Sequence, residues 1–157
     1  MSMPFISKDD IKELMFDGLG WKDREWSKKI GITSYDLLYY FTEALLRVGA
    51  TFILESNFKP EFDNQKFIAL KEKYDFDFVQ ILCKADGEVL FERFKKRSES
   101  GQRHPGHVDA GNYDEFKNFL LSGRCEPLSL PVSVIEVDTT DFDNVDLDAL
   151  IQQMNAR

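Results

Sequence analysis

The 157-residue sequence has little of what would place it outside the ordinary globular proteins. Its two cysteines are too few for a disulfide framework or a four-ligand zinc site. No stretch reaches the ~18 consecutive apolar residues of a membrane span, and the N-terminus MSMPFISKDD lacks the charged and apolar regions of a signal peptide. These absences predict a cytoplasmic protein with no membrane partner.

Positive charge is also scarce. The chain has 20 Lys and Arg against 28 Asp and Glu, a net charge of −8, which argues against non-specific binding along nucleic acid. The basic residues gather in RFKKRSESGQRHPGH, residues 93–107, which holds three arginines, two lysines and both histidines. A role for positive charge should therefore be sought in this stretch.

Hydrophobic residues make up 43% of the chain, with fourteen phenylalanines, enough for one core and one domain over residues 1–157. Short apolar runs predict strands at residues 4–6, 51–55, 78–83 and 132–137. Helical patterns lie between and after them, at about residues 8–18, 35–48, 60–74, 87–100, 113–121 and 145–154. The expected caps of the first, second and fourth helices are Ser7, Thr33 or Ser34, and Asp86, and Pro60 can begin the third. This alternation, with connections too long for hairpins, predicts an open α/β domain built on a parallel sheet.

In such a sheet, ligands bind at the carboxyl ends of the strands. Asp9 and Glu55 each follow a predicted strand. Two acids at adjacent strand ends could hold Mg²⁺ or take a proton from a hydroxyl nucleophile. The alternatives are that Asp9 serves only the N-terminus of its helix, and that Glu55 is an ordinary strand end reaching the surface.

Arg93 and Arg97 are four residues apart on one predicted helix, and Arg103 follows in the next loop. Together they could form a cationic arm that neutralises a transferred phosphoryl group. Basic residues near the end of a helix also complement its dipole, so a purely structural role stays open.

His104 and His107 bracket the turn dipeptide Pro105-Gly106 and should lie on a loop. A metal site would need a third ligand, which Asp109 could supply. Contact with substrate and ordering of the loop are the alternatives.

The segments SKDDIKE, FILESNF, GQRHPGHVD and VIEVDTT, in this order, resemble the small P-loop kinases. The similar group is the "predicted kinase" or AAA-type ATPases related to zeta toxin, chloramphenicol phosphotransferase and the kinase domain of polynucleotide kinase. The resemblance implies a three-layer P-loop NTPase-like parallel sheet with helices on both faces. It also implies a lid at about residues 93–111, ATP and Mg²⁺ as cofactors, and a small-molecule acceptor.

The resemblance also implies roles for individual residues. Asp9 would be the general base, Lys12 would position the substrate, and Glu55 would lie near magnesium. The lid arginines Arg93, Arg97 and Arg103 would close over the ATP phosphates, and Asp138 would lie near adenine. We also expect Asn57, Arg93, His104 and His107 among the substrate contacts.

The sequence departs from this group in one respect: it contains no G-x-x-x-x-G-K-[ST] loop. In the relatives, this loop follows a central strand that lies between the strands equivalent to residues 51–55 and 78–83. The true start could lie upstream, the chain could be a fragment, or the gap could be closed by direct strand pairing or by a second subunit, which would favour a homodimer.

We therefore expect the body of an ATP-dependent small-molecule phosphotransferase, inactive as it stands if the loop is truly absent. The alternative is a non-catalytic remnant that binds a phosphate-bearing ligand or another protein.

Overall fold

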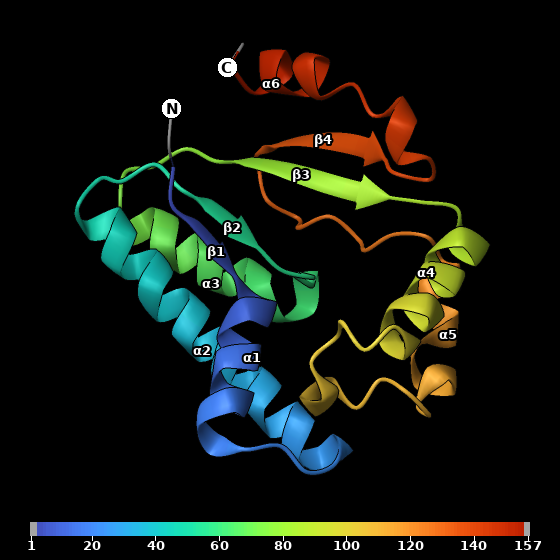
Figure 1. Cartoon of the computed structure of the whole chain (residues 1–157). Coiled ribbons are helices and arrows are strands. Elements are labelled where there is room, and N and C mark those ends of the chain that lie inside the picture. The colour runs from blue at the N-terminus through green and yellow to red at the C-terminus, as the bar shows by residue number, and fades with distance from the viewer. Residues whose placement is uncertain (1–2, 156–157) are drawn as a thin grey trace. The chain divides into compact units, whose positions relative to one another are not determined.

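A computed structural model describes residues 3–155, a mixed α/β chain (Figure 1). The strands are β1 (Phe5–Ser7), β2 (Ile53–Glu55), β3 (Val79–Lys84) and β4 (Ser133–Asp138). The helices are α1 (Lys8–Leu19), α2 (Arg24–Arg47), α3 (Pro60–Lys73), α4 (Gly87–Glu99), α5 (Tyr113–Leu121) and α6 (Leu147–Asn155), with short 3-10 turns at Pro105–His107 and Phe142–Asn144. The chain divides into two compact units, which are described separately.

The strands form two sheets of two strands each, and both pairings are parallel, as predicted. β1 pairs with β2 so that Ser7 stands opposite Glu55. β3 pairs with β4 so that Lys84 stands opposite Asp138. Direct pairing of the strands predicted at 51–55 and 78–83, one of the ways to close the sheet, is not among the ladders of residues 3–155.

The first unit comprises residues 1–57, 70–76 and 97–112. In it, α1 continues directly from β1 (Figure 1), and Ser7 is the N-cap, as the sequence predicts. The Ser7 hydroxyl accepts hydrogen bonds from the backbone N–H groups of Asp9 (3.2 Å) and Asp10 (3.4 Å). It donates to the Glu55 carboxylate at 2.7 Å. One side chain therefore caps the helix and joins the ends of both strands.

The prediction that Thr33 or Ser34 is the N-cap of the second helix is wrong, because α2 begins at Arg24 with Asp23 as its N-cap. Gly31 lies in the interior of this helix, where glycine costs about 1 kcal/mol. Ser34 lies inside the helix, fully buried, and donates to the backbone carbonyl of Ile30 at 2.6 Å. Tertiary packing against α1 outweighs the local preference.

The core of the first unit is built mainly from α1 and α2. Large apolar side chains alternate along it with small hydroxyl-bearing residues, and the Thr42 hydroxyl is satisfied by the carbonyl of Leu38 at 2.8 Å. Because small residues lie between the large ones, α1 approaches α2 closely along this face. The buried apolar residues are Phe16, Ile30, Leu38 and Leu70, and the buried hydroxyl residues on α2 are Ser27, Ser34 and Thr42.

The second unit comprises residues 58–69, 77–96 and 113–157. Asp86 caps α4, as predicted, by accepting from the N–H groups of Glu88 (3.0 Å) and Val89 (3.1 Å). Glycine is required at position 87, since a Cβ there would lie 2.1 Å from the Leu121 carbonyl oxygen. The core residues are Phe67, Leu82, Phe91, Phe94, Leu128 and Ile135.

Within residues 3–155, no helix has both the length and the apolar character needed to cross a membrane.

Leu38 is completely buried, so Leu38→Ala should lower the free energy of unfolding by about 2–5 kcal/mol through lost burial and the cavity left behind. Urea denaturation measures this. Leu14→Ala is the matched control, because Leu14 is 72% exposed and its truncation should leave the free energy nearly unchanged. Equal losses in both variants would contradict the packing described for α1 and α2.

Candidate functional site

The ends of β1 and β2 bring two predicted site residues to one edge of the first sheet. Glu55 is the last residue of β2, and Asp9 lies in the first turn of α1, two residues after Ser7 ends β1. The hydrogen bond from Ser7 to Glu55 ties these two segments together. The structure therefore places the two carboxylates at the carboxyl ends of neighbouring parallel strands, where the strand-end rule led us to expect them.

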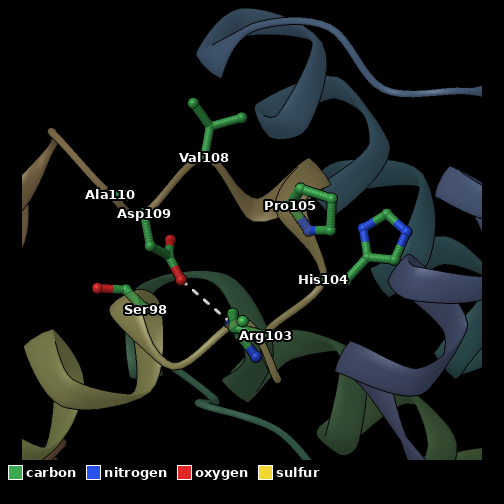
Figure 2. Close-up of a pocket in the computed structure, with 8 residues that line it drawn as sticks. Ser98, Arg103, His104, Pro105, Val108, Asp109 and Ala110 are labelled. Atoms are coloured by element: carbon green, nitrogen blue, oxygen red, sulfur yellow. Dashed lines mark hydrogen bonds and ion pairs between the residues drawn. The ribbon is translucent and has the colours of Figure 1, made fainter.

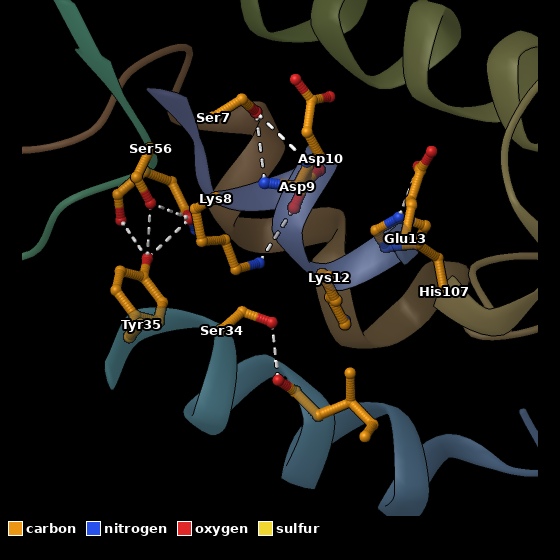
Figure 3. A network of polar contacts seen from close by, with 12 residues as sticks. Ser7, Lys8, Asp9, Asp10, Lys12, Glu13, Ser34, Tyr35, Ser56 and His107 are labelled. Carbon is orange, nitrogen blue, oxygen red and sulfur yellow. Dashed lines mark hydrogen bonds and ion pairs between the residues drawn. The ribbon is translucent and has the colours of Figure 1, made fainter. Parts of the chain in front are cut away.

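Asp9 is held by two cations. Lys8 Nζ lies 2.9 Å from one carboxylate oxygen (Figure 3), and Arg103 Nη1 lies 3.0 Å from the other. Partial burial alone would raise the pKa of Asp9, but the charges of Lys8 and Arg103 hold it well below its usual range. Asp9 is therefore a fully ionised carboxylate at neutral pH.

The basic stretch meets an acidic stripe on α1, which we define as Asp9, Glu13 and Asp17. These residues are four apart, so they lie along one side of the helix. Arg103 binds Asp9, His107 Nε2 lies 2.8 Å from Glu13, and His104 Nε2 lies 3.2 Å from Asp17. Each ionisable side chain of the RHPGH segment thus has its own acid on α1.

Phe16 supports the same contact through its ring. The His104 ring stacks on it at a centroid distance of 5.2 Å, and the His107 ring meets it edge-on at 5.7 Å. A Cβ on Gly106 would lie 2.5 Å from the Phe16 ring, so only glycine fits this approach. The segment His-Pro-Gly-His therefore docks on α1 through both charge and shape.

Arg103 is the centre of this network. Its Nε donates to Asp109 at 3.1 Å, its Nη1 to Asp9, and its Nη2 to His107 Nδ1 at 3.0 Å. Because a guanidinium only donates, Nδ1 must accept, so the proton of neutral His107 is on Nε2, which donates to Glu13. Burial lowers the pKa of His107 to about 3, and the charge of Arg103 adds to the effect.

The metal-site alternative for His104, His107 and Asp109 is wrong. The three side chains bind different partners, namely Asp17, Glu13 and Arg103. Within residues 3–155, no group of three or more His, Cys, Asp or Glu is arranged to hold a metal ion.

Lys12 is a buried cation beside this network, with 6% of its surface exposed. Its Nζ donates to the Ser27 hydroxyl at 3.1 Å and lies 5.4 Å from the centre of the Phe16 ring. Burial lowers the pKa of Lys12 to about 8, and the charge of Lys8 lowers it further while that of Asp9 opposes the change. Lys12 therefore carries a positive charge that is only partly compensated.

Two more predicted residues belong to the first unit. Asn57 Oδ1 accepts from the Tyr35 hydroxyl at 2.9 Å, just beyond the end of β2. Arg97 is exposed at the end of α4. The first unit therefore contains Asp9, Lys12, Glu55, Asn57, Arg97, Arg103, His104 and His107.

Arg93 and Asp138 belong to the second unit. The two terminal nitrogens of Arg93 donate to the backbone carbonyls of Thr139 and Thr140, both at 2.7 Å, and its guanidinium lies 4.4 Å from the centre of the Phe142 ring. Asp138 accepts from the N–H of Thr140 at 2.9 Å, and hydrogen bonding by Thr140 lowers the pKa of Asp138. Arg93 thus orders the loop after β4, and its predicted role in a lid stays a prediction.

Sequence reasoning missed Glu13 and Asp17, and it considered Asp109 only as a possible third metal ligand. The four-residue spacing of Asp9, Glu13 and Asp17 was the available signal, because it aligns the three acids on one helix face. Their basic partners lie close to 90 positions further along the chain, so only the fold reveals the pairing.

Parallel strands joined by helices, with acids at the strand ends, define a mixed α/β protein. A family model described as "AAA domain" matches residues 2–120. The chain therefore belongs to this AAA domain family, of the small P-loop kinase type. No curated protein matches the chain significantly.

Among solved structures, the chain is similar to a "putative kinase" from Chloroflexus aurantiacus J-10-fl. The two sequences are 38% identical, the TM-score is 0.89, and the match covers 98% of this chain and 83% of that one. This likeness supports a kinase-like P-loop phosphotransferase in general terms.

Gly106→Ala should lower the free energy of unfolding by about 1–3 kcal/mol, because its Cβ would overlap the buried Phe16 ring. Thermal or urea denaturation measures this. Gly18→Ala is a control of opposite sign: Gly18 lies in α1 with open space around its Cβ, so alanine should stabilise the helix by up to about 1 kcal/mol. Stabilisation by both changes would rule out the close approach at Gly106.

His107 predicts a pH dependence of stability. Its pKa is about 3 in the folded chain against an ordinary value of 6.5, so below pH 6.5 the unfolded chain binds a proton that the folded chain does not. The free energy of unfolding should fall as pH decreases from 6.5 to 5, by up to about 1.4 kcal/mol per unit for one proton.

His107→Gln should remove the contribution of His107 to the pH dependence of the free energy of unfolding. Urea denaturation at each pH measures this. His104→Gln removes the other histidine and should leave the contribution of His107 in place. A slope unchanged by His107→Gln would mean that His107 is not buried in its neutral form.

Proposed function

We propose that this chain forms the acceptor side of an ATP-dependent small-molecule phosphotransferase. The observation that carries the proposal is the position of Asp9, an ionised carboxylate at the end of β1 with Glu55 at the end of the neighbouring strand. The chain belongs to a P-loop family whose members in general use a nucleotide and Mg²⁺, and this supports ATP as the phosphoryl donor. Buried Lys12 supplies positive charge near the same edge.

In the proposed reaction, the oxygen of an acceptor hydroxyl forms a bond to the γ-phosphorus of ATP. The bond from that phosphorus to the bridging oxygen breaks, ADP leaves, and the hydroxyl proton passes to Asp9. The transition state of such transfers is loose, so the proton leaves the hydroxyl late. A carboxylate with a low pKa is a weak base, and Asp9 therefore acts first as a hydrogen-bond acceptor that orients the hydroxyl.

The described residues do not make a magnesium site by themselves. Glu55 is the predicted ligand, but one of its oxygens accepts from Ser7, and no group of three or more acids, histidines or cysteines gathers around it within residues 3–155. Since carboxylate oxygen is a suitable donor for Mg²⁺, Glu55 could supply one ligand of a larger set.

The predicted lid arginines have different surroundings. The Arg103 side chain is only 17% exposed and donates to Asp9, Asp109 and His107. Arg97 is exposed in the same unit. We propose that Arg97 meets the phosphates of ATP, whereas Arg103 positions Asp9.

The test measures transfer of labelled phosphate from ATP and Mg²⁺ to a set of small hydroxyl compounds, alongside calorimetry of ATP binding. Asp9→Asn should lower the transfer rate by about 10²–10⁴-fold and leave ATP binding unchanged. Asp10→Asn is the matched control, because Asp10 is an exposed neighbour with the same charge, and it should behave like the wild type.

No heat at millimolar ATP would count against the proposal and favour the alternative, a non-catalytic ligand-binding protein. The observation that favours a non-catalytic protein is the absence of a G-x-x-x-x-G-K-[ST] sequence.

A further inference from the structure

A pocket of about 400 Å³ lies within the first unit, in the segment that follows α4 (Figure 2). Its volume falls within the range of roughly 300–1,000 Å³ that is typical of small-molecule sites. It is lined by Ser98, Gly101, Arg103, His104, Pro105, Val108, Asp109 and Ala110. The docking of the RHPGH segment on α1 holds several of these residues in place.

Asp109 is the main polar group of this pocket that can accept a further hydrogen bond. It is 7% exposed, and one carboxylate oxygen accepts from Arg103 Nε at 3.1 Å (Figure 2). Arg103 is the only hydrogen-bond donor among residues 3–155 that reaches this carboxylate. No side-chain polar atom in that range is both inaccessible and without a hydrogen-bond partner, so the second oxygen of Asp109 is accessible and can accept from a bound ligand.

Arg103 is the direct partner of Asp109. It is shared with Asp9 and, at 3.8 Å, with Glu13. Lys12 also interacts electrostatically with Asp109, but its Nζ donates to Ser27. His107 adds no charge at neutral pH, since burial lowers its pKa to about 3. An ammonium group in the pocket would therefore add a direct, charge-assisted hydrogen bond to Asp109.

Apolar atoms form much of the remaining wall, through Pro105, Val108 and Ala110. Val108 has a φ of 55°, a left-handed conformation that costs a β-branched residue about 1–3 kcal/mol. Asn112 Nδ2 donates to the Val108 carbonyl at 2.7 Å and the Val108 N–H bonds to Pro105, which holds the strained residue in the wall. Strain of this kind is concentrated at sites that bind ligands.

We propose that this pocket binds a small amino alcohol, with its ammonium group on Asp109 and its apolar body against Pro105, Val108 and Ala110. Arg103 joins Asp109 to Asp9 through Nε and Nη1, and Asp9 itself is not among the residues that line the pocket. We place the hydroxyl on the side of Asp9, as the phosphoryl acceptor, and this last part rests on the function proposed above.

The experiment uses leucinol, a small amino alcohol with an apolar side chain, added to the full chain while backbone amide signals are followed by NMR without ATP. We expect saturable shifts at residues 98–110. The same alcohol without its amine should bind at least tenfold more weakly. Absence of saturable shifts up to tens of millimolar leucinol, or equal binding of the alcohol without the amine, would overturn the proposal.

Two variants locate the site. Asp109→Asn should weaken leucinol binding at least tenfold, whereas Asp114→Asn, the same change on an exposed residue, should leave it unaltered. Because Asp109→Asn also affects Arg103, Ala110→Leu provides a second check: it fills the pocket from its wall, keeps the ion pair, and should likewise weaken binding at least tenfold. Wild-type affinity in either pocket variant would place leucinol elsewhere and overturn the proposal.

Binding and transfer are separable in these measurements. Leucinol shifts that depend on Asp109 but are followed by no transfer of phosphate would support the pocket and count against the phosphotransferase. Transfer of phosphate to other alcohols, with no leucinol binding at residues 98–110, would support the phosphotransferase and count against the pocket.

Discussion

The docking of the RHPGH segment on the acidic stripe of α1 is the interaction on which the rest of the site depends. It sets the position of Arg103 on Asp9, the neutral state of His107, and the walls of the pocket. Largely buried ion pairs add little net stability, because the desolvation of the charges offsets their attraction, whereas removing one partner leaves a costly unpaired charge. The network therefore determines where the segment lies more than how stable the chain is.

This arrangement accounts for the C-terminal end of the basic stretch. Arg103, His104 and His107 are matched one by one to acids of α1. Neutralisation of a phosphoryl group by the arginines stays a prediction, whereas ordering of the loop follows directly from these contacts. The loop is ordered by the pairing, and the same pairing fixes the ionised state of Asp9, the residue with the strongest claim to function.

The predictions that succeeded rest on local signals. Ser7 as a cap, Pro60 as a helix start, and acids at the ends of parallel strands all follow from patterns a few residues long. The start of α2 was missed because packing against α1 stabilises a helix through Gly31. Glu13 and Asp17 were missed because their partners are distant in sequence, and neither propensity nor periodicity carries information about such a contact.

Arg103 is shared by Asp109 and Asp9, and this affects how the binding of an acceptor and the binding of a phosphate influence one another. Within residues 3–155, Arg103 is the hydrogen-bond donor to the Asp109 carboxylate, so its movement toward a phosphate would leave a buried carboxylate without a direct donor. An ammonium group bound at Asp109 would remove that penalty and release part of the guanidinium for other partners. Since linkage is reciprocal, whatever then binds Arg103 must in turn strengthen the binding of the ammonium compound. An acceptor pocket built around Asp109 thus implies positive coupling between acceptor and phosphate, because the ammonium group takes the place of Arg103 at Asp109 and leaves the guanidinium available to the phosphate.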